Sequence, residues 1–145
     1  MQSVCIEAAH TASPDLVGEI APLVRQLSTS AAPLELKELS EILESPTTTL
    51  LVARDGTGRV MGILTLVTFR IPTGLRAIIE DVVVDVSARG KGIGEALTHE
   101  AIAIARAKGA RTIDLTSRPS REAANRLYQR LGFERRETNV YRLPI

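Results

Sequence analysis

The pattern of hydrophobic and polar positions begins with a short strand and two helices. Residues 3–9 have strand character, and Ser13-Pro14 then offers a helix cap followed by a proline suited to the first helical position. Apolar side chains recur at helical spacing from Leu16 to Leu27 and again after Pro33. The second run stops at Ser45-Pro46. We therefore predict one strand and two helices in this part of the chain.

The middle of the chain has the pattern of consecutive strands. Two β-rich runs, 49–54 and 59–68, flank an Asp55-Gly56 step, which is a hairpin signal. After a further turn at 71–74, the chain enters a β-branched strand over Ile78 to Val86. Three strands joined by turns are predicted.

The last third of the chain alternates helices and strands. An amphipathic helix ends at Lys108-Gly109, where a basic last turn and a glycine are typical of a helix C-terminus. Strand character returns at 111–116. Ser120 can cap a further helix, which Gly132 closes.

Segments 133–136 and 140–143 complete the prediction as two short final strands. The order is then β-α-α-β-β-β-α-β-α-β-β, without internal repeats or a linker. We expect an α/β fold in one domain, residues 1–145, with a mixed central sheet of about seven strands flanked by four helices.

Composition excludes several classes of protein. Hydrophobic residues make up 44% of the 145, which argues against disorder. The net charge of +1 and the aromatic content of 3% provide neither a basic tail nor a base-stacking surface, so no nucleic-acid partner is expected. No apolar run reaches membrane-spanning length, and we expect a cytoplasmic protein without a membrane partner.

The single cysteine and two histidines carry little chemistry. One cysteine excludes a disulfide framework, and Cys5 is expected to be a small buried hydrophobe in the first strand. His10 and His99 lack metal-ligand spacing. No metal is expected.

A glycine-rich turn between the β-branched strand and the following helix is the strongest chemical signal. Gly90, Gly92 and Gly94 leave room for backbone N–H groups to approach an anion, and the helix dipole favours negative charge there. Arg89 and Lys91 add two cations. The stretch predicts a phosphate site, with a merely tight strand-to-helix connection as the structural alternative.

Spacing excludes two common phosphate loops. The dinucleotide fingerprint requires a glycine where Glu95 stands, and the Walker loop requires an ending that Gly94-Glu95-Ala96 lacks. The pattern Arg-x-x-Gly-x-Gly instead resembles the acyl-CoA pyrophosphate loop of the GNAT superfamily of N-acetyltransferases. The resemblance implies that the pyrophosphate of acetyl-CoA is bound by Arg89, Gly90, Lys91, Gly92, Ile93, Gly94 and Glu95.

A second motif supports this resemblance. Arg121–Phe133 ends in Tyr-x-x-x-Gly-Phe and is similar to the helix and turn that the family places against the pantetheine arm. The resemblance implies that Tyr128 is the general acid for the CoA thiolate, and its alternative is an amphipathic residue at the edge of the core. Many members have Asn seven residues before this tyrosine, where this chain has Arg121. Asn125 could reach the cofactor instead, and Arg121 could contact phosphate.

The same resemblance implies the roles of the β-branched strand, because the family commonly bulges this strand and splays it from its neighbour, which exposes backbone N–H and C=O groups. By this likeness the Val82 amide binds the acetyl carbonyl, and Val83 and Val84 bind pantetheine through their main chains. Glu80 is our candidate for the base or for the residue that orients a catalytic water, with a structural ion pair as the alternative. Simple alternation places Glu80 on the face of Val82 and Val84, opposite Asp81 and Val83, so both carboxylates could line one pocket only at a bulge.

These features predict an acetyl-CoA-dependent N-acetyltransferase that acetylates a primary amine, preferably of a small molecule, by direct attack in a ternary complex. A protein N-terminus or lysine is an alternative acceptor, and a non-catalytic acyl-CoA-binding or regulatory domain is the alternative class. The stretch Glu-Asp-Val-Val-Val-Asp is locally similar to glucosamine-6-phosphate N-acetyltransferases, which does not assign the sugar phosphate as substrate. The final strands could pair across a homodimer.

Overall fold

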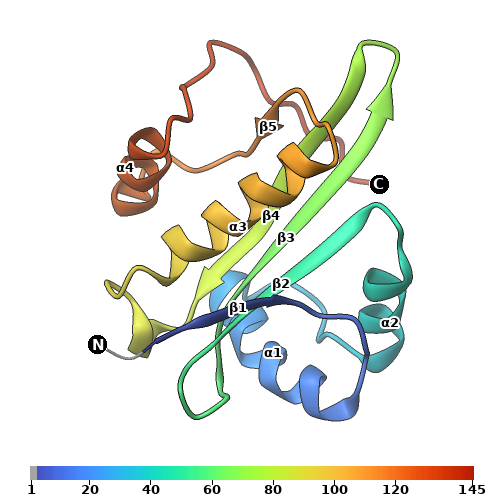
Figure 1. Ribbon diagram of the computed structural model, residues 1–145, viewed down its shortest axis with the longest axis vertical. Coiled ribbons are helices and arrows are strands. Elements are labelled where there is room, and N and C mark those ends of the chain that lie inside the picture. Colours follow the sequence, from blue (N-terminus) through green and yellow to red (C-terminus); the bar gives the residue numbers. More distant parts are fainter. Residues whose placement is uncertain (1–2) are drawn as a thin grey trace. The chain divides into compact units, whose positions relative to one another are not determined.

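The computed structural model describes residues 3–145 and contains one five-stranded sheet (Figure 1). Strands β1 to β4 pair antiparallel with their neighbours, whereas β5 pairs parallel with β4, so the sheet is mixed. The strands are β1 (Cys5–Ala8), β2 (Thr48–Arg54), β3 (Val60–Ile71), β4 (Gly74–Val84) and β5 (Ile113–Asp114). The helices are α1 (Pro14–Leu27), α2 (Leu36–Glu44), α3 (Ile93–Ala107) and α4 (Glu122–Arg130).

The chain divides into two compact units. The first extends to Leu115 and holds the whole sheet with α1, α2 and α3, and the second is Thr116–Ile145 with α4. None of the helices in residues 3–145 has the length and apolar character needed to cross a membrane.

Local sequence explains the ends of the helices in the first unit. Ser13 Oγ accepts the Leu16 N–H at 3.1 Å and Pro14 takes the first helical position, which confirms the predicted cap. Helix α2 begins at Leu36 rather than at the predicted Pro33, without a side-chain cap. Gly109 follows α3 at a φ of 84°, as its predicted role in ending this helix requires.

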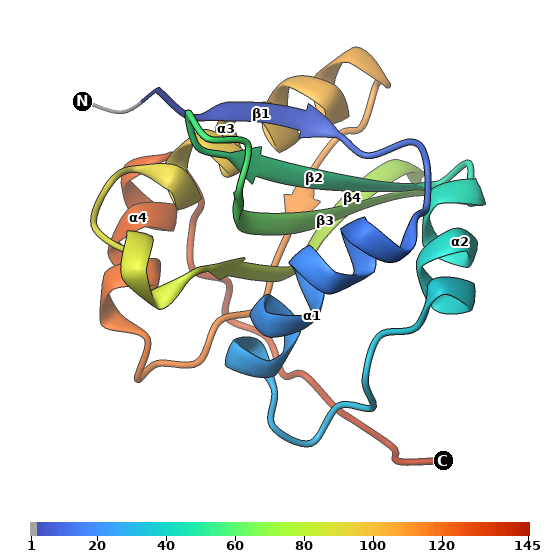
Figure 2. The same ribbon diagram turned by 90° about the horizontal axis from the view of Figure 1, so that it is seen from below.

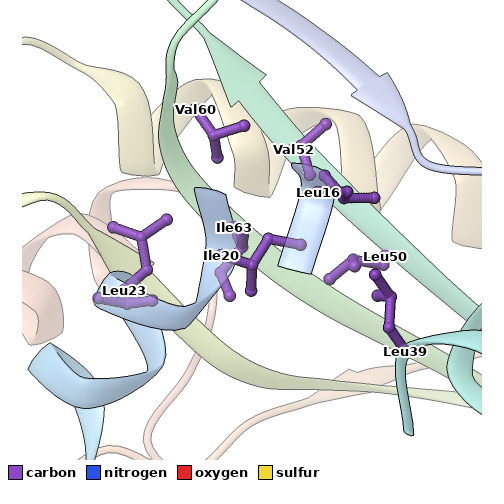
Figure 3. Packing of buried hydrophobic residues seen from close by; sticks show 9 residues of the cluster. Leu16, Ile20, Leu23, Leu39, Leu50, Val52, Val60 and Ile63 are labelled. Carbon is purple, nitrogen blue, oxygen red and sulfur yellow. The ribbon is translucent and has the colours of Figure 1, made fainter. Parts of the chain in front are cut away.

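The sheet separates two helical layers, with α1 and α2 on one face and α3 on the other (Figure 2). Figure 3 shows Ile20 and Leu23 of α1 packed with apolar side chains of β2 and β3, among them Ile63. These three are at most 3% exposed, and burying one such side chain contributes about 1.5–3 kcal/mol. This packing fixes the position of α1 against β2 and β3.

Gly62 of β3 sets the distance between α3 and the sheet. A Cβ at this position would lie 3.1 Å from Ile93 Cγ2, 3.2 Å from Leu97 Cδ1 and 3.2 Å from the Val83 carbonyl oxygen. The first turns of α3 therefore pack directly on the backbone of β3. The N-terminus of α3 is held by this contact.

Strand β4 contains a β-bulge in its middle. Ile63 of β3 pairs with Val83, but Thr65 pairs with Glu80, so two residues of β4 lie opposite the single Leu64. Asp81 lies in the bulge with a φ of 50°, a left-handed conformation that aspartate tolerates better than most residues.

The bulge confirms what the family resemblance implied for this strand, and it replaces the simple alternation of β4. Residues that are directly opposite in a sheet share a face, so Glu80 lies on the face of Thr65, Ile63 and Val83. Regular alternation had placed the Glu80 side chain on the other face of the sheet from the Val83 side chain. The extra residue reverses the alternation, and the face of Glu80 is the one that α1 and α2 cover.

The sheet has five strands rather than about seven. The predicted strand 111–116 is reduced to Ile113–Asp114, and the predicted strands 133–136 and 140–143 are not formed in the described chain. Segment 133–136 contains three charged residues in four, and a strand needs a partner for its N–H and C=O groups. No segments of Thr116–Ile145 pair with each other.

Cys5 is exposed, which corrects the prediction of a buried hydrophobe. Strand β1 lies at the edge of the sheet, and its side chains alternate between exposed and half-buried positions, beginning with Cys5. The sequence identified the strand but not the face that this side chain takes.

The second unit is organised around α4 and the turn that follows it. The residue before the helix is Arg121, without a side-chain cap, so the predicted cap by Ser120 is wrong. Gly132 follows the helix at a φ of 100°, which confirms its predicted closing role. The turn brings Phe133 edge-on to Tyr128, with ring centroids 5.8 Å apart.

Candidate functional site

The outer edge of β4 is open over the half that contains the predicted cofactor residues. Strand β5 pairs with β4 only at Ala77 and Ile78. From Ile79 to Val84, that edge has no strand partner within residues 3–145. Backbone N–H and C=O groups that point outward there can hydrogen-bond an extended ligand in the manner of an added strand.

The glycine turn leads directly from this open edge into α3. Gly90 and Gly92 have φ values of 78° and 79°, a region that glycine adopts without steric cost. A Cβ at either position would meet no atom within 4 Å, so backbone conformation rather than crowding favours glycine. Gly92 is the N-cap residue and has no side chain to cap α3, so no capping side chain accepts the first backbone N–H groups at the positive end of the helix dipole.

Charged side chains flank this helix terminus. Arg89 and Lys91 are exposed, and Arg89 Nε donates to the Val84 carbonyl at 3.3 Å. Glu95 is half-buried in the first turn, and its carboxylate lies 3.7 Å from His99 Nε2. The residues from Arg89 to Glu95 therefore bring two exposed cations and the first turn of α3 into one continuous stretch, and its role in binding an anion stays a prediction.

Asp85 anchors the start of the turn, a role that sequence reasoning missed. Its carboxylate accepts the Ser87 N–H at 2.9 Å and the Ser87 hydroxyl at 2.6 Å, and it also accepts Gln26 Nε2 at 3.2 Å. Hydrogen bonds from Ser87 and then from Gln26, with the charge of Arg59 at 3.7 Å, hold the Asp85 pKa below its usual value against the opposing effect of burial. The spacing Asp-x-Ser was a local signal for the hydrogen bonds between Asp85 and Ser87, but nothing in the sequence indicated the contact with Gln26.

A cavity of about 230 Å³ lies between α1, α2 and the sheet. Ten of its thirteen lining residues are apolar, and they come from α1, the α1–α2 connection, α2, β2 and β3. The three polar residues are Glu38, Thr65 and Asp81. The bulge thus places Asp81 at the cavity wall, next to Val82 and the open edge of β4.

Glu80 lies on the same face but is not part of the cavity wall. It is exposed and pairs with Thr65, which does line the cavity. Within the described chain its carboxylate makes no hydrogen bond or ion pair, so the structural ion pair considered as an alternative is not formed there.

The two predicted residues of the second unit lie on α4. Asn125 Nδ2 donates to the Arg118 carbonyl at 2.9 Å and so fixes the connection before the helix. Tyr128 is 7% exposed; burial raises its pKa, and the positive charge of Arg121 acts in the opposite direction. The phenol is therefore protonated at neutral pH and can donate a proton.

The predicted site residues thus fall into two groups. Glu80, Val82 to Val84 and Arg89 to Glu95 come together along β4, the glycine turn and the start of α3, whereas Asn125 and Tyr128 share α4 in the second unit. Among residues 3–145 there is no group of three or more His, Cys, Asp or Glu side chains that could hold a metal ion.

Comparison with known proteins agrees with this geometry. The sequence model of the acetyltransferase (GNAT) family matches residues 20–133. Glucosamine 6-phosphate N-acetyltransferase of Trypanosoma brucei brucei is 36% identical over 119 residues, which cover 77% of this chain and 79% of that protein. Mycothiol acetyltransferase of Renibacterium salmoninarum is 36% identical over 113 residues, 76% of this chain and 33% of that protein.

A solved structure shows the same fold. A putative acetyltransferase from Agrobacterium tumefaciens str. C58 superposes with a TM-score of 0.85 at 23% identity, covering 97% of this chain and 99% of that chain. The matching family model and relatives define an acyltransferase. The chain belongs to the acetyltransferase (GNAT) family and is an N-acetyltransferase.

Proposed function

We propose that this protein transfers the acetyl group of acetyl-CoA to the primary amine of a small molecule by direct attack in a ternary complex. The observation that carries this proposal is the continuous path from the open edge of β4 into the glycine-capped start of α3. An extended chain with a charged pyrophosphate at one end matches both halves of that path. Acetyl-CoA supplies a thioester carbonyl as electrophile and a thiolate as leaving group.

The proposed cofactor contacts use main-chain groups first. The residues Arg89 to Glu95 bind the pyrophosphate through backbone N–H groups, the α3 dipole and two cationic side chains. Val83 and Val84 hydrogen-bond the pantetheine arm along the open edge. The Val82 N–H binds the acetyl carbonyl and stabilises the negative charge that develops on its oxygen during attack.

Proton movement is assigned to Glu80 and Tyr128. An alkylammonium has a pKa of about 10.4, so the acceptor must lose a proton before its nitrogen attacks the carbonyl carbon. Glu80 takes this proton directly or through a water. As the C–S bond breaks, Tyr128 gives its phenolic proton to the departing thiolate, while Asn125 orients the helix segment that carries it through the bond to Arg118.

A small acceptor fits the size of the cavity beside Asp81 better than a protein segment does. The relatives described above are named for small molecules, glucosamine 6-phosphate and mycothiol. A cavity of about 230 Å³ accommodates a compact amine, whereas a protein lysine or N-terminus would need a surface channel for the flanking chain.

Initial-rate kinetics with a panel of primary amines test this proposal, with CoA release followed by thiol detection. Lines that intersect in double-reciprocal plots are expected for a ternary complex, and parallel lines would contradict direct attack. Glu80→Gln and Tyr128→Phe should each lower kcat about 10²- to 10⁴-fold with little change in acetyl-CoA affinity. Glu100→Gln, an exposed carboxylate on α3, is the matched control. Tight binding of acetyl-CoA without turnover of any amine would favour the non-catalytic alternative.

A further inference from the structure

The charges on the wall of the α1–α2 cavity have one sign. Among residues 3–145, its two charged lining residues are Glu38 of α2 and Asp81 of β4, and no lysine, arginine or histidine lines it. Neither carboxylate makes a hydrogen bond or ion pair with any residue in the part of the chain that the structure describes. The cavity therefore attracts a cation and repels an anion.

The rest of the wall is apolar. Side chains such as Val24, Leu27, Leu34 and Ile42 provide most of the lining, and Thr65 is the only uncharged polar one. Such a surface gains free energy when it covers hydrocarbon and offers few partners to hydroxyl groups, which lose hydrogen bonds to water when they are buried there. A sugar ring is poorly matched to this wall.

The volume sets the size of the occupant. A cavity of about 150 Å³ accommodates benzene, so the 230 Å³ available here suits an aromatic ring with a short aminoalkyl arm or an alkylamine of similar size. Phosphate at the far end of such a molecule would be buried without a cation to pair with it, which is costly.

The backbone places the negative wall beside the proposed reaction centre. Asp81 immediately precedes Val82, whose N–H is assigned to the acetyl carbonyl, and it lies on the cavity side of the bulge. An ammonium drawn to Asp81 would therefore approach the point at which the acetyl group is presented.

We propose that the acceptor is a cationic amine carried on an apolar aryl or alkyl group, held in this cavity by Asp81 and Glu38, and that phosphorylated amines are poor acceptors. This inference rests on the proposed function, since it names the class of amine that the acetyltransferase uses. It separates this chain from the relative named for a sugar phosphate.

Four amines provide the test, and tyramine and its O-phosphate form a matched pair among them. The values of kcat/KM are measured for 2-phenylethylamine, for tyramine and its O-phosphate, and for glucosamine 6-phosphate. We expect at least about a tenfold preference for 2-phenylethylamine and tyramine over the two phosphates. A higher kcat/KM with either phosphate would overturn the inference while leaving the acetyltransferase activity established.

Two substitutions assign the preference to the cavity. Asp81→Asn keeps a residue that tolerates the positive φ, and it should raise the KM for 2-phenylethylamine at least about fivefold with the KM for acetyl-CoA unchanged. Glu38→Lys should shift the ratio of kcat/KM values toward tyramine O-phosphate. Glu41→Lys makes the same charge change on α2 outside the cavity and should leave that ratio unchanged. An equal shift in the Glu41 variant, or none in the Glu38 variant, contradicts the role of the cavity.

Calorimetric binding of 2-phenylethylamine in the presence of CoA separates this inference from the proposed function. If no amine is turned over but 2-phenylethylamine binds and Asp81→Asn weakens its binding, the cavity assignment stands and the catalytic proposal fails. If neither turnover nor binding of 2-phenylethylamine is found, the inference is wrong.

Discussion

The side-chain amide of Gln26 hydrogen-bonds both the carboxylate of Asp85, at 3.2 Å, and the backbone N–H of Val86, at 3.0 Å. These partners lie 59 and 60 residues further along the chain, where β4 ends and the glycine turn begins. Helix α1 is thereby tied to the start of the proposed pyrophosphate site. The same helix provides part of the cavity wall, so one element positions both proposed binding sites.

Replacing Gln26 by leucine should loosen the glycine turn. The substitution removes two hydrogen bonds, one of them to a charged group, and should cost about 1–3 kcal/mol of stability. Because the glycine turn is the proposed pyrophosphate site, the KM for acetyl-CoA should rise about threefold to tenfold. Urea unfolding and steady-state kinetics measure the two effects. Arg25→Leu, at the neighbouring exposed position of α1, is the control, and equal behaviour of the two variants would contradict the anchoring role.

Asp85 should make stability depend on pH in the acid range. Because hydrogen bonds from Ser87 lower its pKa in the folded protein, its contribution is complete above the unfolded value of 3.8 and is lost as pH falls through the folded value. Asp85→Asn should therefore be less stable than the wild type by about 1–3 kcal/mol at pH 7, with a difference that narrows below pH 4. Urea unfolding at several pH values tests this, and a constant difference would be the contrary result.

Gly62→Ala should disturb the packing of α3 on β3. The added Cβ would lie 3.1–3.2 Å from Ile93, Leu97 and the Val83 carbonyl, so these groups would have to shift by a few tenths of an ångström, and the carbonyl belongs to backbone paired in the sheet. Overpacking of this kind costs about 1–3 kcal/mol. Gly18→Ala, where a Cβ meets nothing within 4 Å, is the matched control and should be neutral or slightly stabilising because it lies inside α1. Thermal unfolding of both variants decides the matter.

Tyr128 should titrate above the usual value for a phenol. The chain has two tyrosines and no tryptophan, so in a Tyr141→Phe background the phenolate absorbance near 295 nm reports Tyr128 alone. Burial raises this pKa and Arg121 lowers it, so Arg121→Gln should move the midpoint further upward. A downward movement would show that Arg121 does not act through its charge. Arg126→Gln tests whether any loss of positive charge on α4 has the same effect.

Periodicity predicted much of the fold, and glycine spacing located the turn between β4 and α3. Ser13 and Gly109 act where they were expected because caps depend on neighbouring residues. The bulge at Asp81 depends on how β4 pairs with β3, and alternation within one strand could not indicate it. The bond between Gln26 and Asp85 joins positions 59 residues apart, for which a single sequence holds no signal.

The prediction of two final strands failed for a related reason. Segments 133–136 and 140–143 contain strand-forming residues, but a strand also needs a neighbour of compatible register, which composition does not specify. Val140, Tyr141 and Leu143 are at least 74% exposed instead.

The bulge in β4 has a genetic consequence. Two residues there lie opposite Leu64, so pairing with β3 needs one residue fewer than the strand contains. An in-frame loss of the Asp81 codon would leave Glu80 opposite Thr65 and Val83 opposite Ile63, and would remove the bulge together with one of the two carboxylates at the cavity wall. The length of this strand, and not only its composition, can therefore change during descent, and such a change would remove one of the two carboxylates proposed to select the acceptor while the codons for the glycine turn stay as they are.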